Sequence, residues 1–74
     1  MDEQMQYTPE RLDAMELLSQ AKLLAESGRL DAAHERLDAA EKADPMYLQV
    51  YLDQGTYYIN VDDYGQAKKC YEKA

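Results

Sequence analysis

Residue types in this 74-residue chain recur at one fixed spacing, and this repetition limits the folds open to the chain more than any other feature. Small residues recur at the spacing that separates Ala33 from Ala67. Large apolar residues and turn residues recur in the same register. The other matching pairs are Leu17 and Tyr51, Ala21 and Gly55, Leu24 and Tyr58, Gly28 and Asp62, Leu30 and Tyr64, Leu37 and Tyr71, and Ala40 and Ala74. A fixed period of this kind indicates that one supersecondary unit is built twice.

The first apolar stretch has the spacing of one helix face. Leu17, Ala21 and Leu24 follow one another at intervals of four and three residues, which is the pattern of an amphipathic helix. Thr8 can cap the start of this helix, and Pro9 suits its first turn because proline has no N–H to leave unpaired there. Gly28 is expected to end the helix, since glycine takes positive φ without strain.

Three further helices are predicted after this one. The second runs from near Asp31 to Asp44, where the following Pro45 disfavours helical geometry. The third follows Pro45, and Asp62 and Asp63 are the candidate caps of the fourth. No segment alternates between apolar and polar residues with period two, so no strand is expected. The predicted fold is all-α, with four helices arranged as stacked antiparallel hairpins.

From Ala14 to Ala74 the pattern resembles the tetratricopeptide repeat (TPR) family, whose helix–turn–helix units repeat with the same period as the matching pairs of this chain. Pro45 matches the proline that closes a unit. The resemblance implies a fragment of a TPR-type α-solenoid. We expect a flexible segment at residues 1–7, a first unit with an extended first helix at residues 8–45, and a second unit at residues 46–74 that is truncated at its C-terminal end.

Packing between the helices is implied for thirteen residues. Two helices approach closely only where both offer small side chains, so we expect Ala21 to meet Ala33 and Gly55 to meet Ala67. The full set of implied packing residues is Leu17, Ala21, Leu24, Leu30, Ala33, Leu37, Ala40, Tyr51, Gly55, Tyr58, Tyr64, Ala67 and Tyr71.

The resemblance also implies a binding surface. In the TPR family the first helices of successive units line a concave groove that holds an extended peptide or a partner helix. Leu18, Leu52 and Ile59 fall on this surface, although Leu18 and Leu52 could instead pad neighbouring helices, and an exposed apolar patch usually marks an interaction site. The full set of implied groove residues is Met15, Leu18, Lys22, Ala25, Glu26, Gln49, Leu52, Thr56, Ile59 and Asn60.

Some TPR proteins bind the carboxylate tail of heat-shock chaperones through a clamp of lysine and asparagine residues. The matching positions hold Leu18, Lys22 and Asp53. Only Lys22 is basic, and Asp53 would repel a carboxylate, so binding of such a tail is not expected.

The chain departs from an ideal repeat at three positions. Gln20 and Gln54 stand where the family prefers leucine, which would weaken the packing or place amides at a partly wet seam. Asp62 replaces the usual turn glycine, which aspartate can do because it tolerates left-handed geometry better than most residues.

Isolated reactive side chains carry little functional signal. His34 is the only histidine, and without a positioned partner it is expected to be a solvated surface side chain. Cys70 lies beside Lys68 and Lys69, whose charges could lower its pKa slightly, but we expect an unreactive thiol on a helix face. Tyr57 falls off the predicted core stripes and is a candidate interface contact.

Composition excludes several classes of function. The formal net charge of −7 repels phosphate backbones and anionic lipid heads, so nucleic-acid and membrane partners are not expected. The sequence has no glycine-rich phosphate loop and no nucleophile–base pair, so no enzyme activity and no cofactor or metal are expected. The acidic start lacks the features of a secretory signal, and the single cysteine suits a reducing cytoplasmic setting.

A repeat unit cannot bury its apolar face alone. Either this chain is the amino-terminal piece of a longer array, or a second copy covers its open end, and we expect both together: a truncated piece that forms a homodimer in isolation. The predicted function is a protein–protein interaction module that binds a peptide or partner helix of undefined identity in its groove and self-associates through its open end. The alternatives are a purely structural self-assembly element, or a fragment of a longer scaffold with no binding activity of its own.

Overall fold

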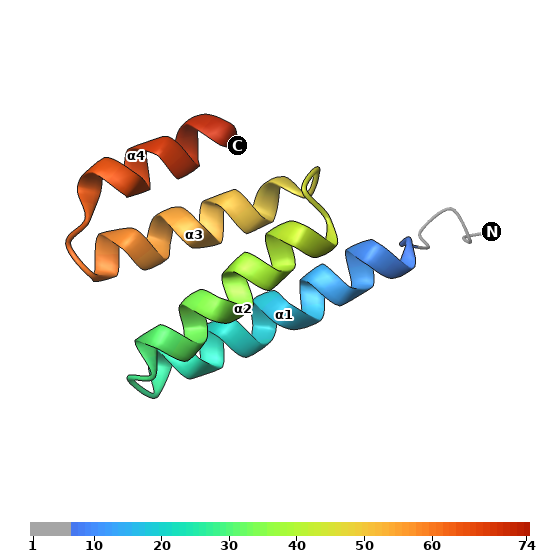
Figure 1. The fold of residues 1–74 in the computed structure, drawn as a ribbon, viewed down its shortest axis with the longest axis horizontal. Coiled ribbons are helices and arrows are strands. Elements are labelled where there is room, and N and C mark those ends of the chain that lie inside the picture. Colours follow the sequence, from blue (N-terminus) through green and yellow to red (C-terminus); the bar gives the residue numbers. More distant parts are fainter. Residues whose placement is uncertain (1–6) are drawn as a thin grey trace.

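The computed structural model describes residues 7–74, which form four α-helices joined by short turns (Figure 1). The helices are α1 (Pro9–Glu26), α2 (Leu30–Ala43), α3 (Leu48–Asn60) and α4 (Tyr64–Lys73). The described residues contain no strand, so the prediction of an all-α chain with four helices is confirmed. Most of the segment expected to be flexible, residues 1–6, lies outside the described residues.

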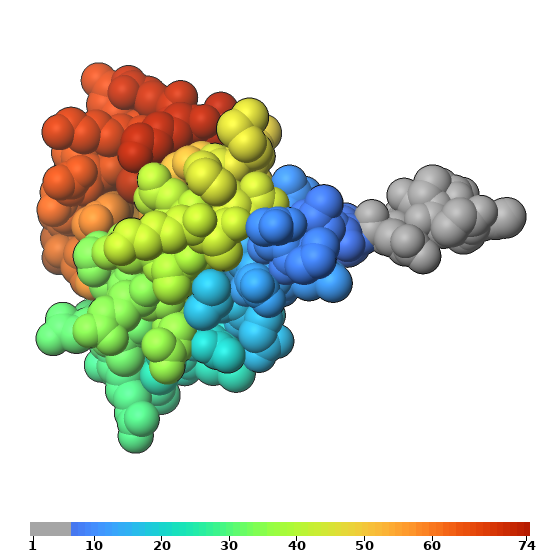
Figure 2. All heavy atoms as spheres, turned by 45° about the vertical axis from the view of Figure 1, so that its right-hand side comes forward, coloured from blue at the N-terminus to red at the C-terminus, as the bar shows by residue number. Residues whose placement is uncertain are grey.

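The helices are arranged as two antiparallel pairs in a row. Figure 1 shows α2 returning alongside α1, and α4 returning alongside α3. The two pairs meet mainly where α3 packs against α2, and α3 also contacts α1. Among the four described helices, α4 contacts α3 alone, and its side chains form the upper edge of the molecule in Figure 2. One side of α4 is therefore left without a neighbouring helix.

Side-chain caps begin two of the helices. At the start of α1, the hydroxyl of Thr8 accepts a hydrogen bond from the backbone N–H of Arg11 at 3.1 Å, and Pro9 occupies the first turn. At the start of α4, the carboxylate of Asp63 accepts from the backbone N–H of Gln66 at 3.3 Å. Both predicted helix starts are confirmed, because these residues satisfy N–H groups that have no partner inside the helix.

The turn between α1 and α2 is built around Gly28, which has a φ of 84°. Arg29 donates its backbone N–H to the carbonyl of Leu24 at 2.8 Å, and Gly28 donates to the carbonyl of Ala25 at 3.0 Å. This pair of bonds is the Schellman motif, which satisfies the last carbonyls of a helix when the next residue is left-handed. The predicted end of the first helix is confirmed.

The turn between α3 and α4 repeats the same motif around Asp62, which has a φ of 63°. Asp63 donates its backbone N–H to the carbonyl of Tyr58 at 2.8 Å, and Asp62 donates to the carbonyl of Ile59 at 3.0 Å. The expectation that Asp62 adopts left-handed geometry in place of a glycine is confirmed. Two turns that lie one sequence period apart thus use equivalent hydrogen bonds.

Three contacts of Arg11 and Asp44 fix the start of α1 to the turn that joins α2 and α3. The Arg11 side chain donates to the Asp44 carboxylate at 2.6 Å, and its guanidinium carbon lies 4.1 Å from the centre of the Tyr47 ring. The other carboxylate oxygen of Asp44 accepts from the backbone N–H of Met46 at 3.3 Å. The Asp44 carboxylate therefore bonds both to α1 and to the turn between α2 and α3, which orients the two hairpins.

Small side chains are buried where helices approach each other. Ala33 is 1% exposed and Ala67 is 3% exposed, so neither faces water. The main core lies among α1, α2 and α3 and consists of Ala14, Leu18, Ala21, Leu37, Ala40 and Val50. Of the thirteen expected packing residues, the buried ones are Ala21, Ala33, Leu37, Ala40, Tyr51, Gly55 and Ala67.

The other expected packing residues are less buried than predicted. Leu17, Leu24 and Tyr58 are half-buried, and Leu30, Tyr64 and Tyr71 are exposed. The expectation that Tyr64 packs inside the protein is wrong, because Tyr64 is 63% exposed and α4 has only α3 as a neighbouring helix.

Ala14, Val50 and Cys70 are buried although they were not predicted as core, and Leu18 takes the alternative role of padding a neighbouring helix. Leu18 is 7% exposed because α1 contacts both α2 and α3, so its buried stripe is wider than a single row of residues. Gln54 is also buried, and its amide donates to the Glu41 carboxylate at 2.9 Å. This amide thus links α3 to α2.

Candidate functional site

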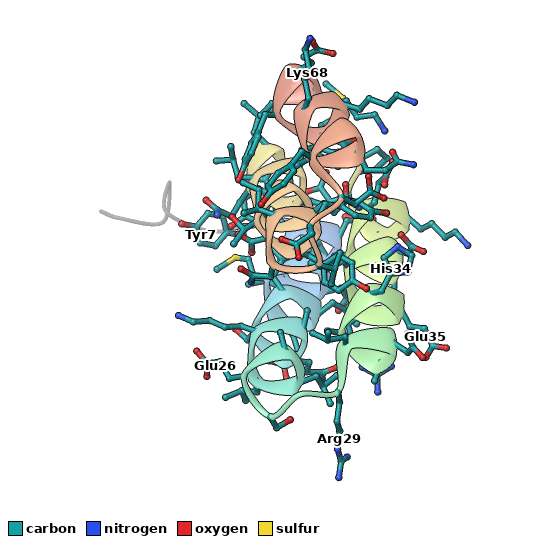
Figure 3. All side chains as sticks on the ribbon, turned by 90° about the vertical axis from the view of Figure 1, so that its left-hand side faces the viewer. Tyr7, Glu26, Arg29, His34, Glu35 and Lys68 are labelled. Carbon is teal, nitrogen blue, oxygen red and sulfur yellow. The ribbon has the colours of Figure 1, made fainter. Side chains whose placement is uncertain are left out.

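A hollow of about 330 Å³ lies between α1 and α3, with α2 behind it. Side chains from α1 and α3 form its walls, and α2 contributes small and apolar side chains. In Figure 3, Glu26 lies on the α1 side of the molecule, and His34 and Glu35 lie on the α2 side. The residues that line the hollow are Leu18, Ala21, Lys22, Ala25, Glu26, Ala33, Leu37, Asp53, Thr56, Tyr57 and Asn60.

The hollow brings together part of the expected groove. The groove residues that line it are Leu18, Lys22, Ala25, Glu26, Thr56 and Asn60. Those that do not line it are Met15, Gln49, Leu52 and Ile59. Leu52 is exposed on α3, and Ile59 faces a different hollow, beside α4.

Five lining residues were absent from the expected groove set: Asp53 and Tyr57 on α3, and Ala21, Ala33 and Leu37, which were expected to pack between helices. On α3, Asp53, Thr56, Tyr57 and Asn60 follow one another at three, one and three residues, which places them on one helix face. Extending the face that includes Thr56 and Asn60 would have found Asp53 and Tyr57. Asp53 and the two residues at the other clamp positions, Leu18 and Lys22, all line the hollow.

The rim of the hollow carries an excess of negative charge. Lys22 supplies one positive charge, whereas Glu26 and Asp53 supply two negative charges. The Asp53 carboxylate accepts a hydrogen bond from the side-chain amide of Gln49 at 2.8 Å, which holds it in place on α3. A bound carboxylate would meet one favourable and two unfavourable charges at this rim, so the rim favours a cationic group.

Tyr57, which lines the hollow from α3, belongs to an aromatic cluster. The Tyr57 ring centre lies 5.3 Å from that of His34 and 5.2 Å from that of Tyr58. His34 Nε2 and the Tyr58 hydroxyl share a hydrogen bond at 3.0 Å. Burial raises the pKa of both tyrosines, and the carboxylate of Asp38 adds to the effect. The expectation that His34 is merely a solvated side chain is wrong, because it joins α2 to α3.

The environment of Cys70 is also different from the expected one. The thiol is buried against α3, with its sulfur 3.8 Å from the side-chain carbonyl of Gln54. Burial raises the pKa of Cys70, and the charge of Lys73 offsets this only in part. The expectation that Lys68 and Lys69 lower its pKa is therefore wrong, and the buried thiol is a packing group.

A second, shallow hollow lies on the outer face of α3 and α4. Its large apolar members are substantially exposed: Ile59 is 41%, Tyr64 is 63% and Tyr71 is 39% exposed. The residues that line it are Ile59, Tyr64, Ala67, Lys68, Tyr71 and Glu72. We call this surface the α3–α4 face.

Within residues 7–74, no three histidine, cysteine, aspartate or glutamate side chains gather as they would around a metal ion. None of the helices in this part of the chain combines the length and the apolar character that crossing a bilayer requires. Comparisons with protein-family models, with curated proteins and with solved structures find no match to the chain.

Proposed function

We propose that this protein is an interaction module of the tetratricopeptide type, which binds a peptide or a partner helix between α1 and α3 and self-associates through the α3–α4 face. The fixed sequence period, the antiparallel hairpins and the repeated turn at Gly28 and Asp62 support the family assignment. Each of these features follows from one unit being built twice.

The observation that carries the proposal is the hollow between the first helices of the two hairpins. Its volume of about 330 Å³ lies at the low end of the range of ligand sites, about 300–1,000 Å³. Buried Ala21 and Ala33 leave space on its floor, while Thr56, Tyr57 and Asn60 offer hydrogen-bonding groups on its wall. Such a site suits an apolar side chain of an extended partner, with polar groups fixing its orientation.

The charges favour a basic partner. Glu26 and Asp53 outnumber Lys22 at the rim, and the whole chain has a formal charge of −7. The rim charges act at contact range and set specificity, while the net charge speeds the approach of a cationic peptide. The preferred ligand is therefore a peptide that presents an apolar side chain next to lysine or arginine.

Fluorescence anisotropy with short labelled peptides tests this proposal. One peptide carries leucine flanked by lysine and arginine, and its counterpart carries leucine flanked by glutamate. The basic peptide is expected to bind at least about tenfold more tightly. Asp53→Lys should reverse this preference, whereas Glu35→Lys, the same charge change at an exposed position outside the hollow, should leave the preference in place.

Equal effects of Asp53→Lys and Glu35→Lys would contradict the proposal, because they would show that net charge alone attracts the peptide. Leu18→Asp is unsuitable as a binding variant, since Leu18 lies in the core and the charge would unfold the protein.

A purely structural self-assembly element is the second candidate. The exposed apolar residues of the α3–α4 face favour it, because an apolar surface of this kind gains stability when covered. Self-association without binding of any of the peptides would support this candidate over the first.

A further inference from the structure

The α3–α4 face carries one residue of each charge, on neighbouring turns of the same helix. Lys68 and Glu72 lie four residues apart on α4 and both line the shallow hollow. Figure 3 shows Lys68 at the outer edge of α4, pointing away from α1 and α2. Lys73 lies elsewhere, because its ammonium is 5.5 Å from the ring centre of Tyr51 in α3. Along α4, the positive charge that lines the apolar hollow thus precedes the negative one.

This pattern is complementary to itself. When two copies of a helix pack antiparallel about a two-fold axis, a residue before the axis meets a residue after it on the other copy. Lys68 of one copy then meets Glu72 of the other, and symmetry makes the same pair a second time. The exposed rings of Tyr64 and Tyr71 flank these pairs. Tyrosine is favoured at interfaces because its ring is apolar while its hydroxyl can form hydrogen bonds with water.

Head-to-tail stacking of two copies is less favourable. In such a stack, α1 of one copy would sit on the α3–α4 face of the next, as α3 sits on the first hairpin. Glu16 would then take the place of Val50, which is fully buried. Glu16 is exposed and accepts a hydrogen bond from Gln20 at 3.2 Å, and burying its carboxylate against apolar groups would be costly. The α3–α4 face therefore matches its own copy better than it matches α1.

We infer that the α3–α4 face is a two-fold symmetric interface between two copies of this chain, with Lys68 of each copy paired to Glu72 of the other. The inference rests on the self-association part of the proposed function and specifies its geometry. Because a two-fold interface closes on itself, the product is a dimer and not an open filament.

Charge reversal combined with sedimentation equilibrium tests the inference. Lys68→Glu places two like-charged pairs in the interface, as does Glu72→Lys, so each variant is expected to weaken the dimer by about tenfold or more. Mixing the two single variants should restore the dimer as a heterodimer, because Lys68→Glu supplies two acids and Glu72→Lys supplies two bases. The double variant with both substitutions should also dimerise.

Lys69→Glu is the matched control, since Lys69 is exposed on the same helix but does not line the hollow. Its dimer should be as strong as that of the unaltered protein. A chain that stays monomeric throughout the accessible concentration range would overturn the inference, and so would equal weakening by Lys68→Glu and Lys69→Glu or a failure of mixing to restore the dimer. Peptide binding measured on the same samples tests the proposed groove separately from the dimer. The hollow between α1 and α3 and the α3–α4 face share no lining residue, so loss of the dimer need not affect peptide binding.

Discussion

Close packing at single residues holds the second hairpin together. A methyl group on Gly55 would lie 2.6 Å from a ring carbon of Tyr71, so the ring of α4 rests directly on the backbone of α3. The Tyr71 hydroxyl also shares a hydrogen bond at 3.3 Å with the hydroxyl of Thr56. Gly55 is therefore required here for space rather than for an unusual φ.

Gly55→Ala and Tyr71→Ala, combined in a double-mutant cycle, test this contact. Alanine in the middle of a helix normally stabilises by about 0.5–1 kcal/mol relative to glycine. We expect no gain, or a loss of about 1–3 kcal/mol, in the unaltered protein, because the methyl group displaces the Tyr71 ring. In the Tyr71→Ala background the normal gain should return. Urea unfolding followed by circular dichroism measures all four free energies, and an equal effect of Gly55→Ala in both backgrounds would disprove the contact.

Among the elements, α4 has the weakest attachment. It packs on α3 alone among the described helices, whereas α2 has α1 on one side and α3 on the other. Its buried contribution is limited to Ala67 and Cys70. An element with few buried contacts opens more readily than the rest of a domain.

Amide hydrogen exchange should therefore show two behaviours. At low protein concentration the backbone amides of α4 are expected to exchange faster than those of α2, because α4 can detach without breaking the core among α1, α2 and α3. At high concentration the dimer should cover α4 and slow its exchange selectively. Mass spectrometry of the exchanged peptides measures both, and protection of α4 equal to that of α2 in the dilute protein would contradict this account.

For the molecule as a whole, folding keeps several titratable groups in their neutral forms. Burial raises the pKa of the Cys70 thiol above its ordinary value of 9.0 and that of the Tyr57 and Tyr58 hydroxyls above 10.0. A raised pKa means that the folded state holds the proton more tightly than the unfolded state does. The stability that these groups contribute is complete below their ordinary values and is lost as the pH rises through the folded values.

We therefore expect the free energy of unfolding to fall as the pH is raised above about 9, with Cys70 acting first and the two tyrosines at higher pH. Cys70→Ser removes the first titrating group and should reduce the loss between neutral pH and the onset of tyrosine ionisation. Urea midpoints measured across this range provide the test. A Cys70→Ser variant that loses stability as steeply as the unaltered protein would show that the thiol pKa is not raised by folding.

The number of helices, and several of the residues near which they begin or end, could be predicted from local sequence signals. Thr8, Gly28, Pro45 and Asp63 act within one helical turn of their own position, so their effect does not depend on the rest of the chain. The left-handed turn at Asp62 belongs to the same class, because its hydrogen bonds join residues close in sequence. The repetition of residue types also placed Ala21, Ala33, Ala40 and Ala67 among the buried residues, but not Ala14.

Which sides of the helices are covered, and where the hollow lies, depends on how the helices pack in three dimensions. Leu18 is buried and Tyr64 is exposed because α1 has two neighbouring helices and α4 has one. Asp53 and Tyr57 enter the hollow because α3 is turned toward α1 at that point, and Tyr57 is held there by His34 from α2. A helical pattern defines an apolar stripe but not its neighbours, since burial depends on residues far away in the sequence.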